Sequence, residues 1–204
     1  MSTALAAALL AAGMRLVASH AYPDGAPPGF TGGFREDNCT ACHFHETLNA
    51  APGKLAIDGL PAAFAPGERY TLTITLTRDG MKRAGFQLAA RFIDDGTQAG
   101  TLMVGSSDAR RVKLENQGGV LYAGQNKTGS EITDAGKMKW SVDWIAPVGG
   151  RRAVRINVAA NAADGDERVD GDFIYTAVFE ISPALAARPE AGPKNTAASE
   201  AQPR

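Results

Sequence analysis

Histidine and cysteine are scarce in this chain of 204 residues, which has three histidines and two cysteines. No histidine follows His45, so a serine-type catalytic triad has no base in the rest of the chain. No block of lysine and arginine stands out and the net charge is −1, which argues against a nucleic-acid partner. No apolar run reaches membrane-spanning length, so we do not expect the chain to cross a bilayer by itself.

Helical periodicity is equally scarce, and between residues 54 and 182 apolar residues recur at every second position instead. Leu72, Ile74 and Leu76, for example, alternate with threonines. Such alternation is typical of antiparallel strands with one face on a core and the other toward water. Turn signals separate the segments with this pattern, which are 70–76, 86–92, 101–104, 111–115, 120–122, 140–144, 154–160 and 173–181. About seven to nine short strands predict an all-β fold, a two-sheet β-sandwich.

The two ends of the chain differ in composition from this central part. Residues 1–21 contain a short apolar run, and Ser19 and Ala21 fit the small-x-small pattern before a signal-peptide cleavage site. No lysine or arginine precedes the run, so an ordinary N-terminal helix is the alternative. We predict a signal peptide at 1–21 and export to the periplasm or the cell exterior. Residues 183–204 carry no large apolar group after Leu185, which predicts a flexible tail.

The most informative segment is NCTACHFHETLN at 38–49, which holds both cysteines and two of the three histidines. Cys39, Cys42 and His43 form the pattern C-x-x-C-H. In a first interpretation the two thiols bond covalently to one porphyrin and His43 binds its iron. In a second, the cysteines are a redox dithiol, which normally lies at a helix N-terminus in a βαβ unit. In a third, they form a structural disulfide or part of a zinc site that includes His45.

The context of the motif favours one covalently bound haem c. No βαβ pattern surrounds the cysteines, as a redox dithiol would need. Ligands clustered within the seven residues Cys39–His45 also make a poor tetrahedral cage for zinc. The predicted export signal agrees with the haem interpretation. We therefore prefer haem attachment to a redox dithiol and to a disulfide or zinc site.

The second axial position of such an iron needs a separate candidate. Met81 lies in the turn sequence RDGMKRAG, where we expect it at the edge of the sandwich and free to reach the iron. It is therefore the preferred distal ligand, because methionine is a known axial partner of histidine. Met103 and Met138 fit strand interiors and are expected to pack there. The alternatives are an open iron site, which would bind a small ligand, and a Met81 that is merely exposed in its turn.

Several of these segments together resemble the bacterial reeler-like proteins. The resemblance runs over most of residues 27–176 and includes PPGFTGGFREDNCTACH at 27–43, GFQL at 85–88, and Asn161 with GDFIY at 171–175. In that family an immunoglobulin-like β-sandwich carries a C-x-x-C-H segment near its N-terminus. The resemblance implies a haem-binding segment at 22–53 packed on a reeler-like sandwich at 54–182. It implies an exported protein without a defined reaction.

Two functions stay open at this point. The first is an exported mono-haem c-type protein for electron transfer or small-ligand sensing, which would serve a redox partner protein. It would not be an enzyme in itself, because no general acid–base pair accompanies the motif. The alternative is an extracellular adhesion or binding module with a Cys39–Cys42 disulfide and no haem. The acidic run Asp164–Asp172 would then belong to the binding surface, and we prefer a solvated hairpin loop there over a calcium site.

Overall fold

The computed structural model describes residues 22–149 and 151–184 of the chain. The predicted signal peptide at 1–21 and all but the first two residues of the predicted tail lie outside this range. The described residues form ten strands and three short 3-10 helices, and no α-helix occurs among them. No helix in this part of the chain is long and apolar enough to cross a membrane.

The elements follow one another with short connections. The strands are β1 Lys54–Asp58, β2 Ala63–Phe64, β3 Arg69–Thr77, β4 Arg83–Phe92, β5 Thr101–Val104, β6 Val112–Gln117, β7 Val120–Gln125, β8 Lys137–Ile145, β9 Val154–Ala163 and β10 Phe173–Pro183. The 3-10 helices are η1 Cys39–Ala41, η2 Ser106–Asp108 and η3 Thr128–Ser130. Because β10 continues to Pro183, the predicted tail boundary at residue 183 falls inside the last strand.

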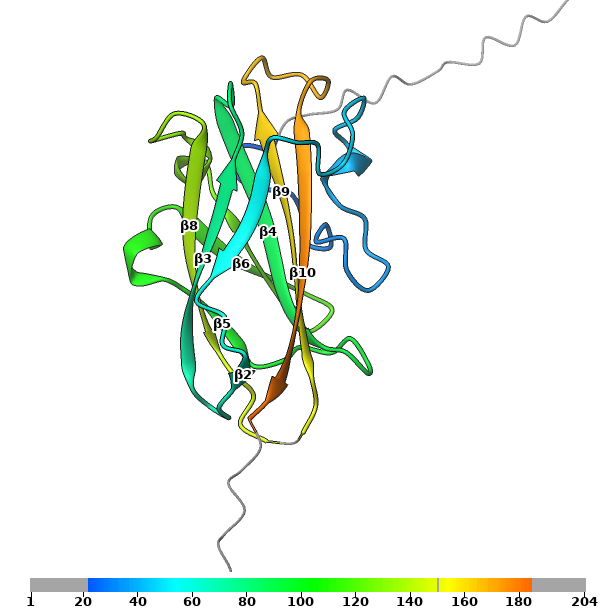
Figure 1. Cartoon of the computed structure of the whole chain (residues 1–204), viewed down its shortest axis with the longest axis vertical. Helices are drawn as coiled ribbons and strands as arrows, with labels where there is room; N and C mark the ends of the chain where they lie inside the picture. Colours follow the sequence, from blue (N-terminus) through cyan, green and yellow to red (C-terminus); the bar gives the residue numbers. More distant parts are fainter. Residues whose placement is uncertain (1–21, 150, 185–204) are drawn as a thin grey trace, which may run out of the picture.

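The strands form two sheets packed face to face, as Figure 1 shows. One sheet has the order β1-β3-β8-β5 and the other β2-β10-β9-β4-β7-β6. Every pair is antiparallel except the short contact of β2 with β10. The predicted all-β sandwich is confirmed, with ten strands instead of seven to nine. The two additional strands are β1 and β2, which are short strands at sheet edges and show little alternation.

The inner faces of the two sheets supply the core. Leu72, Ile74 and Leu76 of β3 are fully buried, as the period-two pattern predicts. On the neighbouring strand β8 of the same sheet, Trp140 and Trp144 are also fully buried, and each indole N–H donates to a backbone carbonyl. The alternation therefore identified the core-facing side chains of these strands correctly.

Part of the outer face of the larger sheet is shielded from water, because residues 22–53 lie over it. We call these residues the cover segment, and Figure 1 shows them in blue outside the sandwich, beside β9 and β10. After η1 the segment is tied to the last strand, where the Asn49 N–H donates to the Ile174 carbonyl at 2.9 Å. The Tyr175 hydroxyl donates to the Ala50 carbonyl, also at 2.9 Å. These bonds hold the motif against one face of the sandwich.

Polar side chains on the covered face are consequently buried. Gln87 and Arg91 of β4 and Asn157 of β9 are each less than 7% exposed, although they point away from the core. The Phe30 N–H donates to Gln87 Oε1 at 2.6 Å, and Arg91 is paired with Glu36 of the cover segment. The expectation that every strand has one water-facing side is therefore wrong for β4 and β9.

Candidate functional site

The C-x-x-C-H motif lies on a single tight turn. Asn38 caps η1, and its Oδ1 accepts a hydrogen bond from the Thr40 N–H at 2.8 Å. The His43 N–H donates to the Cys39 carbonyl at 2.9 Å, which closes the turn. Asparagine is favoured at such a position because its short side chain satisfies a backbone donor that the helix leaves free. The turn places Cys39, Cys42 and His43 along the wall of one pocket.

This pocket has a volume of about 660 Å³, within the range of small-molecule and cofactor sites. Its wall is formed by the cover segment, the start of β4, the end of β7 with the residues that follow it to Ser130, the end of β9 and the acidic loop between β9 and β10. Apolar residues contribute much of the wall and three cationic side chains border it. The apolar residues include Pro23, Ala26, Pro27, Phe30 and Ala84, and the cations are Arg83, Lys127 and Arg168. Arg83 and Arg168 are already paired with Glu131 and Asp170, so Lys127 is the border cation without an ion pair among the described residues. The carboxylates of Glu167 and Asp172 also line the wall. Such a pocket suits a large, mostly apolar group.

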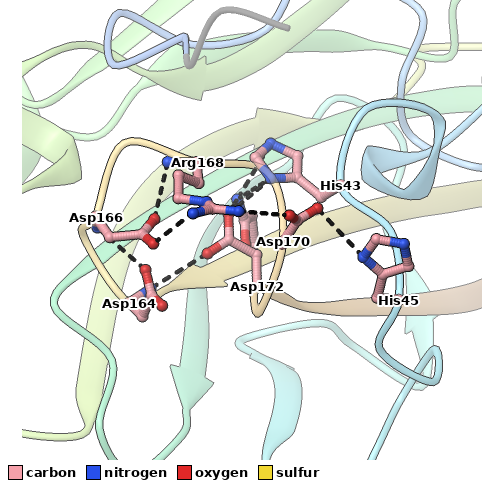
Figure 2. A network of polar contacts seen from close by, with 8 residues as sticks. His43, His45, Asp164, Asp166, Arg168, Asp170 and Asp172 are labelled. Atoms are coloured by element: carbon pink, nitrogen blue, oxygen red, sulfur yellow. Dashed lines mark hydrogen bonds and ion pairs between the residues drawn. The ribbon is translucent and has the colours of Figure 1, made fainter.

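His43 is held by a buried carboxylate. Its Nδ1 lies 2.6 Å from Asp172 Oδ2, and the side chains are 16% and 2% exposed respectively. Figure 2 shows Asp172 beneath the imidazole, at the root of the acidic loop. A ring nitrogen so close to a carboxylate carries a proton and donates a hydrogen bond to it. Nε2 is then the nitrogen available to a ligand. Histidines that bind metals are usually oriented in this way by a second group.

Asn161 of β9 completes this part of the site. Its Nδ2 donates to Asp172 Oδ2 at 3.2 Å and lies 3.4 Å from both ring nitrogens of His43. Its Oδ1 is buried and has no hydrogen-bond partner among the described residues. A buried acceptor without a donor costs free energy unless something else supplies one. An unpaired oxygen on a residue of the pocket wall is therefore a feature that a bound group could satisfy.

The acidic loop mostly satisfies its own polar groups. Asp164 and Asp166 accept hydrogen bonds from loop backbone N–H groups, and Asp170 is paired with Arg168 at 3.2 Å. His45 lies 3.2 Å from the same Asp170 carboxylate, on the exposed side of the loop (Figure 2). The part of the chain that the structure describes contains no cluster of three or more ligating side chains arranged for a metal ion. These contacts are those of a hairpin loop whose carboxylates stabilise turns.

Both cysteines are free thiols. Burial raises the pKa of the Cys39 thiol to about 12, and the neighbouring Cys42 adds to this shift. A thiol with so high a pKa is almost entirely protonated at neutral pH and is a slow nucleophile in disulfide exchange. The environment of Cys39 is thus the opposite of the one that activates a redox dithiol.

Met81 is placed differently from the prediction. It is 5% exposed and belongs to the apolar core of the sandwich, so the expectation of a methionine free at the edge is wrong. The turn before it is tight, with the Met81 N–H donating to the Arg78 carbonyl, and this directs the side chain inward. Met81 does not belong to the wall of the pocket that holds the motif. Its assignment as distal iron ligand stays an untested prediction.

The other candidate ligands are also outside the pocket wall. Met138 is buried in the core, as expected, whereas Met103 is 37% exposed on β5. His45 is 67% exposed and paired with Asp170. Among the described residues, His43 is therefore the one histidine or methionine of the wall.

A porphyrin attached at the motif is compatible with the residues present. The two thiols and His43 share one pocket, much of the wall is apolar, and Lys127 at its border has no ion pair among the described residues.

Asp172 and Asn161 were not identified as site residues from the sequence. Asp172 reads as one more carboxylate of a solvated turn, and Asn161 lies within the run VAANAA. Asn161 could have been recognised from the sequence as a polar residue inside an otherwise apolar strand, since a buried amide needs a hydrogen-bond partner.

Comparisons with known proteins identify similar folds at low identity. No protein-family model and no curated protein matches the chain. The human F-spondin reeler domain is 17% identical over 68% of this chain and 94% of that chain, with a TM-score of 0.47. The Reelin-N domain of F-spondin is 16% identical over 72% and 96%, with a TM-score of 0.48.

Other solved structures with a similar architecture belong to proteins of different kinds. AvmM, named for catalysing macrocyclization in alchivemycin A biosynthesis, is 14% identical over 72% of this chain and 97% of its own, with a TM-score of 0.44. A non-cellulosomal cohesin from Archaeoglobus fulgidus is 11% identical over 62% and 91%, with a TM-score of 0.37. None of these names mentions haem, and at such identities the likeness concerns the fold alone.

Proposed function

We propose that the chain is an exported β-sandwich protein that carries one covalently attached haem c. Cys39 and Cys42 would each hold the porphyrin through a thioether bond, and His43 would bind the iron through Nε2. The observation that carries the proposal is the convergence of these three side chains on one pocket, with the second nitrogen of His43 already engaged by buried Asp172.

The bound group would supply one-electron redox chemistry or a binding position for a small ligand. The chain's own residues would orient the imidazole, exclude water from one side and hold the group against the sandwich. Lys127 would offer positive charge to its carboxylates at the border of the pocket, and Arg83 and Arg168 could do so by exchanging their present partners Glu131 and Asp170. An electron carrier of this kind would work with a redox partner protein and would need no general acid–base pair.

A second candidate is an extracellular binding module without haem. The observation in its favour is that the core between the two sheets is complete without the cover segment, so the sandwich does not depend on the motif for its main apolar packing. In that case Cys39 and Cys42 would form a disulfide, and the loops of the sandwich would bind a partner. The raised pKa of the Cys39 thiol argues against a role in redox exchange, and it does not distinguish haem attachment from a static disulfide.

The test is to produce the full chain together with a haem-maturation system and to stain a denaturing gel for haem. We expect a stained band, and a mass that exceeds that of the bare polypeptide. Cys39→Ala combined with Cys42→Ala should abolish both. His45→Ala is the matched control, because this neighbouring histidine is exposed and lies outside the pocket wall.

A colourless protein with the mass of the bare chain would contradict the haem proposal. If that protein also has no thiol that reacts after unfolding, the disulfide of the second candidate is present instead.

A further inference from the structure

Asp172 is an unusual carboxylate for a surface loop. It is 2% exposed, and among the described residues its one ion-pair partner is His43. Its Oδ1 accepts the Asp164 N–H at 3.2 Å, and its Oδ2 accepts from Asn161 at the same distance. An ionised carboxylate removed from water is costly unless hydrogen bonds and an opposite charge compensate it. The arrangement gives the imidazole a strong acceptor that solvent does not weaken.

The neighbouring His45 and Asp170 provide an internal comparison. This pair is 3.2 Å apart and its members are 67% and 40% exposed. Water competes with such a contact and screens it, so it contributes little. The buried pair is shorter, is shielded from water and belongs to the pocket wall, so the two pairs differ in their ability to affect a bound group.

A carboxylate that accepts the Nδ1 proton changes the chemistry of the opposite nitrogen. It fixes the tautomer and the ring orientation, and it raises the electron density at Nε2. A more electron-rich ligand stabilises ferric iron relative to ferrous iron, because the ferric ion carries the larger positive charge. Hydrogen bonding of this type is one of the means by which a protein sets a haem potential.

We infer that Asp172 is a positioning residue for His43, which orients the imidazole toward the pocket and lowers the reduction potential of the iron bound there. This inference rests on the proposed haem attachment at Cys39 and Cys42.

The experiment compares reduction potentials of the matured holoprotein and two matched variants. In Asp172→Asn the acceptor loses its charge, so the potential should shift to a more positive value while haem staining remains. Asp164→Asn removes the same charge from an exposed position of the same loop, outside the pocket wall, and keeps the side-chain oxygen that accepts the Asp166 N–H, so its potential should stay at the wild-type value. Thermal unfolding of each variant checks that the fold is retained.

A second variant gives a shift of opposite sign and does not alter the carboxylate. Asn161 donates to the same oxygen that accepts from His43. Asn161→Ala removes this competing donor, so Asp172 should accept a stronger hydrogen bond from His43 Nδ1. The reduction potential of the iron should then become more negative. This variant keeps the inference open to refutation if Asp172→Asn fails to fold.

The outcomes separate the two proposals. A wild-type protein that stains for haem, with unchanged potentials in both Asp172→Asn and Asn161→Ala, overturns the role of Asp172 and leaves haem attachment intact. Equal shifts in Asp172→Asn and Asp164→Asn also overturn it, because they would reflect the loss of charge from the loop and not the contact with His43. A protein without haem overturns both proposals at once.

Discussion

Glu36 of the cover segment joins Thr31 of the same segment to Arg91 and Tyr122 of the sheet beneath it. Its carboxylate accepts hydrogen bonds from Arg91, from the Tyr122 hydroxyl and from the Thr31 hydroxyl. Arg91 and Glu36 are 7% and 14% exposed, so the ion pair is largely removed from water. Interactions of this kind are weak sources of net stability, but they become costly when one partner is lost.

Replacing Glu36 with alanine should therefore be strongly destabilising. The substitution leaves the Arg91 guanidinium buried without its counter-charge, and we expect a loss of about 3 to 5 kcal/mol in the free energy of unfolding. Urea denaturation measures this value. Glu68→Ala is the control, because Glu68 is exposed and its change should stay within about 0.5 kcal/mol. A Glu36→Ala protein as stable as the control would show that the pair is solvated in solution.

Tyr122 makes the free energy of unfolding depend on pH in the alkaline range. Burial, assisted by the hydrogen bond to Glu36, raises the pKa of Tyr122 from 10.0 to about 12. Below pH 10 the phenol is protonated in both the folded and the unfolded chain, so its contribution is fully present. Between pH 10 and pH 12 the unfolded chain loses its proton first, and the folded state loses stability as the pH rises.

The expected result is that Tyr122→Phe flattens this alkaline decline. Urea midpoints measured from pH 8 upward would show it, and Tyr22→Phe serves as the control because that side chain is exposed. An unchanged slope in Tyr122→Phe would mean that other groups cause the decline.

Among single residues, the sequence identifies the three residues of the motif but not Asp172, the partner of His43. Cys39, Cys42 and His43 are recognisable because their spacing has few chemical uses. Asp172 could not be separated from the neighbouring acidic residues, since its burial depends on contacts between the loop and the cover segment. Met81 was misplaced for a similar reason, because a turn sequence does not show whether its side chain points inward.

Strands β4 and β9 are the elements on which the site depends. They are buried on both faces, by the core on one side and by the cover segment on the other. On the outer face of β4, Gln87 donates to the Pro27 carbonyl of the cover segment at 2.8 Å, and Arg91 donates to the Glu36 carboxylate. Period-two patterning predicts the strands and their inner faces, whereas a covering loop leaves no periodic signal of its own.

Gly33 shows how closely the cover segment approaches β9. A Cβ at this position would overlap the side chain of Asn157, which is itself 3% exposed. Gly33→Ala should therefore lift the segment locally and lower the free energy of unfolding by about 1 to 3 kcal/mol. Gly149→Ala is the control, because a methyl group at that position would meet no other atom within 4 Å. Equal stability of the two variants, measured in urea, would contradict close packing of the segment.

The whole molecule is a two-sheet core with one outer face covered by residues 22–53. Beneath the cover lies a small second apolar cluster of Ala89, Val120 and Tyr122. Removing residues 22–53 should expose this cluster and leave Arg91 unpaired. We expect a loss of at least the roughly 3 kcal/mol attributed to Arg91 alone, measured by urea unfolding.

Removing residues 185–204 is the comparison for this deletion. The sequence predicts a flexible tail there, so stability should not change. If both truncated chains unfold at the same urea concentration as the full chain, the cover segment contributes no stability to the sandwich.

The contact between His43 and Asp172 has a consequence for the timing of assembly. The two residues are separated along the chain by the nine strands β1 to β9. Because synthesis proceeds from the N-terminus, the motif emerges before its carboxylate partner. Under the proposed haem attachment, an enzyme that acts on the cysteines before Asp172 has emerged would meet an imidazole without this restraint. The contact can close only after the loop between β9 and β10 has been made.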